Sequence, residues 1–316
     1  MRNLITILLF LSTTAFAAYE YSGQWGETGP GEGQFREPFG VDIADNGDIF
    51  IADVYNFRVQ HFDSAGGFIG TFGDYGDTDG RFLQPYWLGV APGGNIYVAD
   101  IAKKNIQYFT PTGAFLGKWG SEGTGPGQFD YPNGIAINKS NGDVYVTDYW
   151  NNRVQRFEPD GTFVGEWGAN GSGDGQFKFP CGVAVAPTGN VYVVDSNNHR
   201  VQYFSSDGSY LGQWGGYGSG AGSFSYPGDI EVKDSGAVYV MDTGNNRFQY
   251  FTSGGSYMGE YGAYGSGNGQ FNYPWGIAAI GNTVYVADSG NDRVQYFTST
   301  TSIKSASLSE IKAIFK

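Results

Sequence analysis

Three carboxylates stand out because they lie at matching distances from a recurring proline. Asp42 follows Pro38 by four residues, and Asp229 and Glu231 follow the equivalent proline of a later segment by two and four. Positions two apart in a β-strand project to the same side, so Asp229 and Glu231 should point in one direction. If all three acids line a shared, water-filled channel, they suit a hard cation such as Ca²⁺. The alternatives are that they are solvated, or that nearby Lys233 neutralises them.

The sequence lacks other common arrangements of catalytic and metal-binding residues. Its two histidines, His61 and His199, fall at unlike positions and are too few for a histidine-rich zinc cage. No Gly-x-Ser-x-Gly or His-Glu-x-x-His pattern occurs. The single cysteine, Cys181, excludes an internal disulfide and a site built on several thiolates. We expect it to be a free and poorly accessible thiol.

The segments that position these residues are internal repeats. A Gly-Gln-Phe phrase or a looser copy precedes each proline, and an aspartate follows it about 15 residues later. Both landmarks recur every 46 to 48 residues, so six units fill nearly all of the chain after residue 17. The prolines are Pro38, Pro85, Pro132, Pro180, Pro227 and Pro274, and the aspartates are Asp53, Asp100, Asp148, Asp195, Asp242 and Asp288.

A complete unit contains four short segments in which β-branched and aromatic residues alternate, which indicates β-strands. In the third unit they are 134–138, 143–148, 153–158 and 162–168. Four strands repeated six times predict an all-β, six-bladed β-propeller with four antiparallel strands per blade. The last unit lacks its fourth strand, and residues 19–26 match the missing segment. The N-terminal strand is therefore predicted to complete the last blade and close the ring.

The repeat resembles a known family. The phrases GPGQFDYPNGIAI and GDVYVTDYWNNRVQRF of the third unit resemble an NHL repeat, and all six units match over roughly residues 19 to 298. The resemblance implies a six-bladed propeller but no particular activity, because propellers host many unrelated sites. Some members bind RNA, which the acidity of this chain argues against. Amidating lyases, which use a similar propeller, hold zinc with several histidines that this chain lacks.

One rim of the propeller is the expected binding face. It carries the entry loops, which join the fourth strand of one unit to the first strand of the next, and the middle loops, which join the second and third strands. In the middle loops, only the first three units carry aromatic or lysine residues. The rings could hold a ligand and the lysines could read an acidic group. Alternatively, the rings pack beneath the entry loops. The candidates, with Trp87 and Trp150 as anchors, are Phe39, Tyr55, Phe57, Tyr86, Trp87, Lys103, Lys104, Tyr149 and Trp150.

A second repeated pair has a structural explanation. Five units carry an arginine five residues after the repeated aspartate, as in Asp148 and Arg153. Recurrence in five units favours a structural brace over catalysis. The second unit has Asn105 instead, so Lys103 or Lys104 is the candidate replacement.

Charge and the chain ends limit the partners and the location. A net charge of -13, from 18 basic and 31 acidic residues, argues against nucleic acid and anionic membranes as partners. Residues 1–17 have the pattern of a signal peptide cleaved between Ala17 and Ala18, too short to span a bilayer. We therefore expect a secreted, periplasmic or cell-surface propeller over 18–300 without membrane insertion. The tail 301–316 is predicted to be either a short helix over about 308–315 or a frayed end.

Two functions remain open at this point. The first is an exported, non-catalytic and monomeric binding module that holds a protein, peptide or glycan and needs no cofactor. The alternative is a metal-dependent lyase or lactonase with a cation such as Ca²⁺ held in the central channel. The metal ligands would then be Asp42, Asp229 and Glu231.

Overall fold

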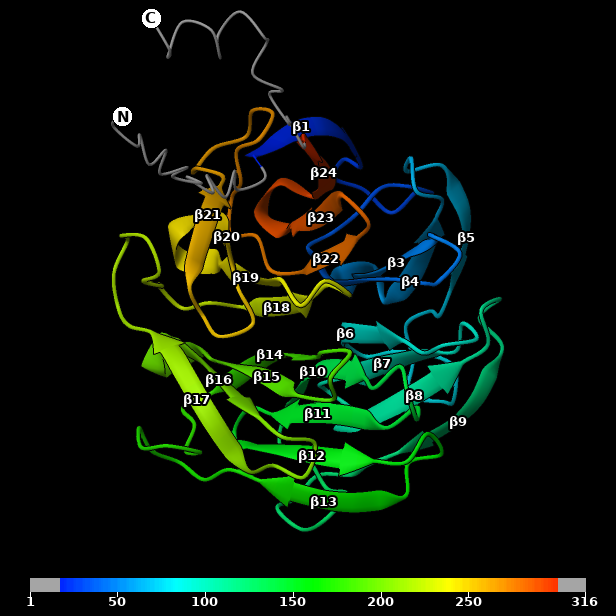
Figure 1. The fold of residues 1–316 in the computed structure, drawn as a ribbon. Helices are drawn as coiled ribbons and strands as arrows, with labels where there is room; N and C mark the ends of the chain where they lie inside the picture. The colour runs from blue at the N-terminus through cyan, green and yellow to red at the C-terminus, as the bar shows by residue number, and fades with distance from the viewer. Residues whose placement is uncertain (1–17, 301–316) are drawn as a thin grey trace, which may run out of the picture.

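The computed structural model describes residues 18–300, which form six four-stranded antiparallel sheets arranged around a central axis (Figure 1). This confirms the predicted six-bladed propeller. Blade 1 contains β2 (Pro38–Ile43), β3 (Ile49–Asp53), β4 (Arg58–Phe62) and β5 (Phe68–Phe72); blade 2 contains β6 (Pro85–Val90), β7 (Ile96–Asp100), β8 (Asn105–Phe109) and β9 (Phe115–Trp119). Blade 3 contains β10 (Pro132–Ile137), β11 (Val144–Asp148), β12 (Arg153–Phe157) and β13 (Phe163–Trp167); blade 4 contains β14 (Pro180–Val185), β15 (Val191–Asp195), β16 (Arg200–Phe204) and β17 (Tyr210–Gly215). Blade 5 contains β18 (Asp229–Val232), β19 (Val238–Asp242), β20 (Arg247–Phe251) and β21 (Tyr257–Tyr261); blade 6 contains β22 (Ile277–Ile280), β23 (Thr283–Asp288), β24 (Arg293–Thr300) and β1 (Ala18–Trp25).

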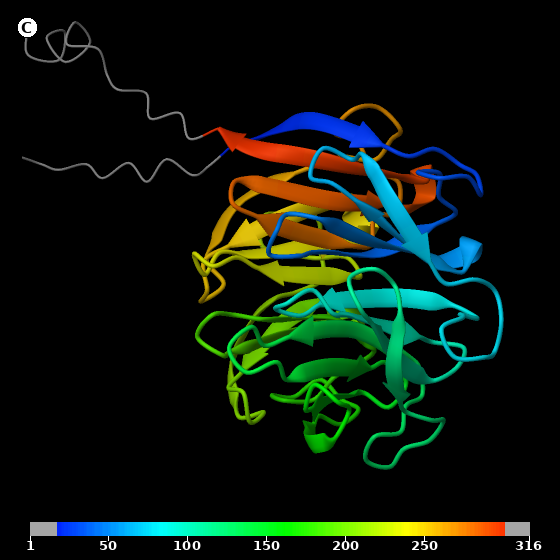
Figure 2. The same ribbon diagram turned by 90° about the vertical axis from the view of Figure 1, so that its right-hand side faces the viewer.

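The ring closes through the N-terminal strand, as the sequence predicts. β1 pairs antiparallel with β24, from Ala18 opposite Thr300 to Trp25 opposite Val294. Figure 2 shows the two strands side by side, one blue and one red. Because the first and last parts of the chain share one sheet, β24 has no unpaired edge.

The middle loops contain single turns of 3₁₀ helix in four blades. These turns are η1 (Val54–Asn56), η2 (Ser196–Asn198), η3 (Thr243–Asn245) and η4 (Ser289–Asn291). Each begins directly after the repeated aspartate and ends at a residue in the left-handed conformation. These four middle loops therefore share one backbone shape, and their side chains distinguish the blades.

The repeated aspartate and arginine form the expected brace in five blades, with Nε to Oδ2 distances of 2.7 to 3.0 Å. The arginine also donates to carbonyl oxygens of the entry loop, as Arg58 does to Gly31 and Gln34. In blade 2, Lys103 takes over these contacts, because its Nζ donates to the carbonyls of Thr78 and Arg81. All six entry loops are thus fastened to their own blade.

The described residues do not test the predictions for the two ends of the chain. The predicted signal peptide, 1–17, and the predicted tail helix both lie outside the described range. Within residues 18–300, no helix is long and apolar enough to cross a bilayer.

Candidate functional site

The innermost strand of each blade lines a narrow channel along the propeller axis. Two residues after the repeated proline, four blades have glycine. A Cβ atom added to any of them would come within 3.0 Å of the next blade's backbone. The crowding confirms that this column faces the axis and explains its composition. The four glycines are Gly40, Gly134, Gly182 and Gly276.

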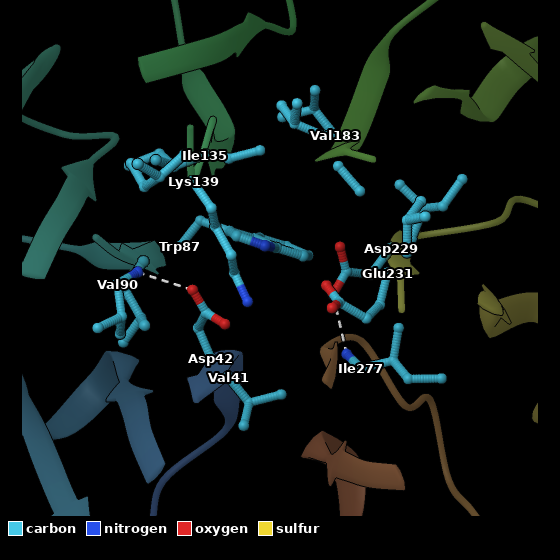
Figure 3. Close-up of a pocket in the computed structure, with 17 residues that line it drawn as sticks. Val41, Asp42, Trp87, Val90, Ile135, Lys139, Val183, Asp229, Glu231 and Ile277 are labelled. Atoms are coloured by element: carbon cyan, nitrogen blue, oxygen red, sulfur yellow. Dashed lines mark hydrogen bonds between the residues drawn. The ribbon is translucent and has the colours of Figure 1, made fainter. Parts of the chain in front are cut away.

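Trp87 occupies the same column in blade 2, and its indole crosses the channel (Figure 3). Only 3% of this residue is exposed. The sequence predicts Trp87 as an anchor on the open rim, but the structure places it inside the channel. The physical reason is strand geometry: a residue two positions into the first strand points at the axis rather than at the rim.

The three predicted carboxylates do converge, on a channel cavity of about 60 Å³. Asp42 approaches from β2, and Asp229 and Glu231 approach from β18 on the opposite side (Figure 3). Asp42 accepts hydrogen bonds from the backbone N–H groups of Val90 and Ile43, each at 2.7 Å. Asp229 accepts one from Ile277 at 2.8 Å. Both aspartates therefore join their own blade to the next one.

Burial strongly perturbs these acids. Desolvation raises the pKa of Asp42 to about 6 and that of Asp229 to about 8, although backbone N–H donors oppose both shifts. The pKa of Glu231 is raised well above its usual range, by desolvation first and by the Asp42 charge second. Near neutral pH, the cavity therefore holds a mixture of ionised and protonated carboxyl groups.

A lysine that the sequence did not single out also lines the cavity. Lys139 extends from the turn between β10 and β11 towards the acids (Figure 3), and its charge lowers the pKa of Asp42 and of Glu231. Lys233, the expected neutralising residue, instead places its Nζ 5.3 Å from the centre of the Tyr239 ring. Comparing the repeats could have identified Lys139, because no other blade has a basic residue at this turn position. The equivalents of Lys139 are Asp45, Pro92, Pro187, Asp234 and Gly281.

The cavity does not fit the predicted Ca²⁺ site. Among residues 18–300, no group of three His, Cys, Asp or Glu side chains is placed to hold a metal ion. Ca²⁺ takes six to eight oxygen ligands, whereas both Asp42 oxygens already accept backbone N–H groups. The remaining walls include aliphatic residues such as Val41 and Ile135, which offer no side-chain oxygen.

The predicted rim aromatics form part of a longer chain of rings, here called the rim arc. Neighbouring ring centres lie 4.1 to 5.8 Å apart, and the rings come from blade 6 and from blades 1 to 4. Four members were predicted, whereas Trp275, Tyr131 and Phe179 were missed. Tyr131 and Phe179 directly precede a repeated proline, whereas Trp275 directly follows one, at the same position as the predicted Phe39 and Tyr86. In spatial order, the rim arc consists of Trp275, Phe39, Tyr86, Tyr131, Tyr149, Phe179 and Trp150.

Exposure differs sharply along the rim arc. Trp150 is 51% exposed, whereas Phe39 is only 5% exposed. Tyr55, beside the arc in the middle loop of blade 1, is 47% exposed. Phe57 packs instead against Tyr75 of an entry loop, with ring centres 4.9 Å apart. Both alternatives for the aromatics are therefore realised: some rings pack under loops and others reach solvent.

The two rim lysines are not free to receive an acidic ligand. Lys103 is bonded to entry-loop carbonyls, and Lys104 forms an ion pair with Asp130 at 2.8 Å. The Lys104 ammonium also lies 5.8 Å from the centre of the Tyr131 ring. The prediction that these lysines read an acidic group therefore loses its structural support, because each charge already has partners.

The backbone holds several rim rings in an uncommon conformation. Tyr131 and Phe179, each directly before a proline, have φ angles of 81° and 55°. Positive φ is rare for bulky residues and persists only where surrounding contacts impose it. At Phe179 one such contact is visible, because its backbone N–H donates to Asn152 Oδ1 at 3.0 Å. These rings are therefore presented in fixed positions.

Exposed tyrosines also occur outside blades 1 to 3. They lie on entry loops, whereas the residues that predicted a bland rim for blades 4 to 6 lie in the middle loops. Tyr75 of an early entry loop is similarly exposed. The late tyrosines are Tyr217, Tyr226, Tyr264 and Tyr273.

The histidines take no part in the channel cavity. His61 Nε2 lies 2.8 Å from Asp48 Oδ2, and its ring stacks on Phe50. His199 Nδ1 accepts a hydrogen bond from the backbone N–H of Tyr226 at 3.1 Å. Desolvation lowers the pKa of His199, which favours this neutral, accepting form. Neither residue is among those that line the cavity.

Cys181 is a free, buried thiol, as predicted, with 2% of the residue exposed. Desolvation raises its pKa to about 12, so almost no thiolate is present at pH 8. We expect a polar thiol reagent to label the native protein slowly and the urea-unfolded protein rapidly. Mass spectrometry measures both labelling rates. Equal rates in the two states would contradict the burial of Cys181.

The fold and the repeats together define the class of the protein, a six-bladed β-propeller with equivalent blades. The NHL repeat family matches residues 35–62, 129–157, 177–204 and 271–297. The chain therefore belongs to the NHL-repeat six-bladed propellers.

Comparisons with individual proteins add relatives of two kinds. A 48-residue segment of this chain is 50% identical to the B-box type zinc finger protein ncl-1 of Caenorhabditis elegans. A segment of 48 residues is also 48% identical to the protein brain tumor of Drosophila melanogaster. Each match covers 15% of this chain but only 6% and 5% of those proteins.

Among solved structures, virginiamycin B lyase from Staphylococcus aureus has a TM-score of 0.61 at 16% identity, covering 89% of this chain and 99% of that one. A gluconolactonase from Xanthomonas campestris has a TM-score of 0.63 at 14% identity, covering 85% and 87%. At such identities the likeness shows the fold alone.

Proposed function

We propose that this NHL-repeat propeller is an exported, non-catalytic binding module that holds a protein, peptide or glycan on the rim carrying the rim arc. The observation that carries the proposal is the continuous row of seven rings, which ends in the exposed Trp150. Aromatic rings offer a large contact area with few rotatable bonds to freeze. Such a row on one rim therefore suits recognition.

The rigidity of this rim supports the same proposal. Arg153 donates to the entry-loop carbonyls of Thr124, Gly125 and Gln128, and Gln155 fixes the same loop through Gly127. Loops that are already ordered lose little conformational entropy when a ligand binds. The surface next to the rim arc is thus preorganised.

The enzyme alternative has weaker support. It rests on the shared fold with a lyase and a lactonase, and fold alone does not transfer a reaction. The channel acids do not fit the Ca²⁺ site that this alternative needs. The cavity of about 60 Å³ is also far smaller than the several hundred Å³ of a typical organic-ligand pocket.

The test is to screen the protein over residues 18–316 on a glycan array and on a peptide array. For any probe that binds, Trp150→Ala is expected to weaken binding by about 30-fold, which corresponds to about 2 kcal/mol. Because Trp150 is half exposed, its loss should leave the melting temperature almost unchanged.

The matched control is Tyr257→Ala, which removes an exposed ring from the outer strand β21, away from the rim arc. This variant should bind like the unmodified protein. If Trp150→Ala and Tyr257→Ala bind a probe equally well, the rim arc is not the site.

A further inference from the structure

We propose that the channel cavity is a binding site for a primary ammonium group, and that Lys139 is a built-in competitor for it. This site is separate from the rim arc. It combines an indole, three carboxyl groups and aliphatic walls around a space large enough for only a small group (Figure 3).

The chemistry of the walls favours an organic cation. Trp87 places its indole across the channel between Asp42 on one side and the β18 acids on the other (Figure 3). Indole is the aromatic group that attracts cations most strongly through its face. Carboxylates supply the opposite charge, and the aliphatic residues tolerate a carbon attached to the ammonium. The cavity thus offers each element that an alkylammonium ion requires.

The available acceptors suit an ammonium better than a metal ion. A primary ammonium has three N–H donors, whereas Ca²⁺ takes six to eight oxygen ligands. Glu231 accepts no hydrogen bond from any described residue, although its side chain lines the cavity. Asp42 and Asp229 are already fixed by backbone N–H groups. Glu231 is therefore the acceptor that a bound ammonium would satisfy.

Lys139 already places an ammonium group beside these acids. Its ammonium end points into the cavity between Asp42 and Glu231 (Figure 3). Its charge interacts with both carboxylates. The residue stands on a turn and is exposed to solvent, so its side chain can swing out without unpacking the blade. An incoming ammonium would replace one positive charge with another of the same kind.

The titratable groups around the cavity predict how affinity depends on pH. The acids facing the cavity are Asp42, Asp229 and Glu231, the facing base is Lys139, and the nearby charges are Asp45, Asp234 and Lys233. Burial raises the pKa of all three facing acids, so part of the carboxyl population is protonated near pH 7. A bound cation favours ionised carboxylates, so binding releases protons. Affinity should consequently rise from pH 6 to pH 8.

The experiment is a calorimetric titration of Lys139→Ala with methylammonium chloride, against sodium chloride at equal ionic strength. Removing the internal competitor should make methylammonium bind about tenfold more tightly than it binds the unmodified protein. Lys118→Ala, which removes an exposed lysine of the outer strand β9 that pairs with Asp79, should bind like the unmodified protein. Adding Glu231→Gln to Lys139→Ala should weaken binding about tenfold again.

Folding of each variant is checked by its melting temperature, because Gln retains the size of Glu231 and should leave the blade intact. Three results would overturn the proposal. These are an equal response to sodium and methylammonium, unchanged affinity after Glu231→Gln in a folded protein, and tighter binding of CaCl₂ than of methylammonium. The last result would restore the metal-site prediction. A failure here would leave the rim arc untouched, since the arrays test that site separately.

Discussion

Removal of residues 18–26 is expected to lower the melting temperature by about 10 °C or more, or to prevent folding altogether. The deletion strips β24 of its partner along the whole register from Thr300 to Val294. It also removes the Trp25 ring, which packs 5.6 Å from Phe62 of blade 1. The Tyr19 hydroxyl, 2.6 Å from that of Tyr239, is lost as well. Both seams of the closing blade are therefore weakened at once.

A pair of point variants separates closure from general sensitivity to tryptophan loss. Trp25→Ala should cost about 3 to 5 kcal/mol, because it leaves a cavity between two blades. Trp150→Ala should cost only about 0.5 kcal/mol, because its ring is half exposed. Thermal unfolding followed by circular dichroism gives both values. If the truncated and full-length proteins have the same melting temperature, β1 does not hold the ring closed.

The fold could be predicted because the same physical constraints act six times. The spacing of the prolines and aspartates fixed the blade length, and the missing fourth strand of the last unit fixed the closure. The brace of Asp148 and Arg153 could be assigned to structure because it recurs. Repetition distinguishes residues that every blade needs from residues that only one blade carries.

The site was harder to predict, because a departure from the repeat does not reveal which neighbours a side chain meets. Trp87 departs from the glycine column, yet strand geometry turns it into the channel instead of onto the rim. Lys103 also departs from the repeat, but its ammonium replaces arginine contacts within blade 2. Lys139 extends towards the acids from a turn in blade 3, and linear spacing does not encode this charge interaction between blades.

Replacing the brace aspartate of blade 4 should be among the most damaging single changes in the protein. Asp195 is fully buried and accepts hydrogen bonds from Asn198, Arg200, Gln202 and the backbone N–H of Lys178. Asp195→Ala leaves a buried guanidinium without its counter-charge. The expected cost is about 3 to 5 kcal/mol in the free energy of unfolding, measured by urea denaturation.

Blade 2 supplies an internal comparison for this brace. Asp100 is equally buried but faces Asn105, so its removal strands no arginine and should cost less than the loss of Asp195. The exposed Asp77, which changes net charge by the same amount, is the surface control and should be nearly neutral on replacement by Ala. If Asp100→Ala and Asp195→Ala destabilise the protein equally, the stabilisation comes from the backbone N–H groups that both aspartates bind. The arginine would then serve mainly to hold the entry loop. It would position the rim arc and add little to the stability of the blade.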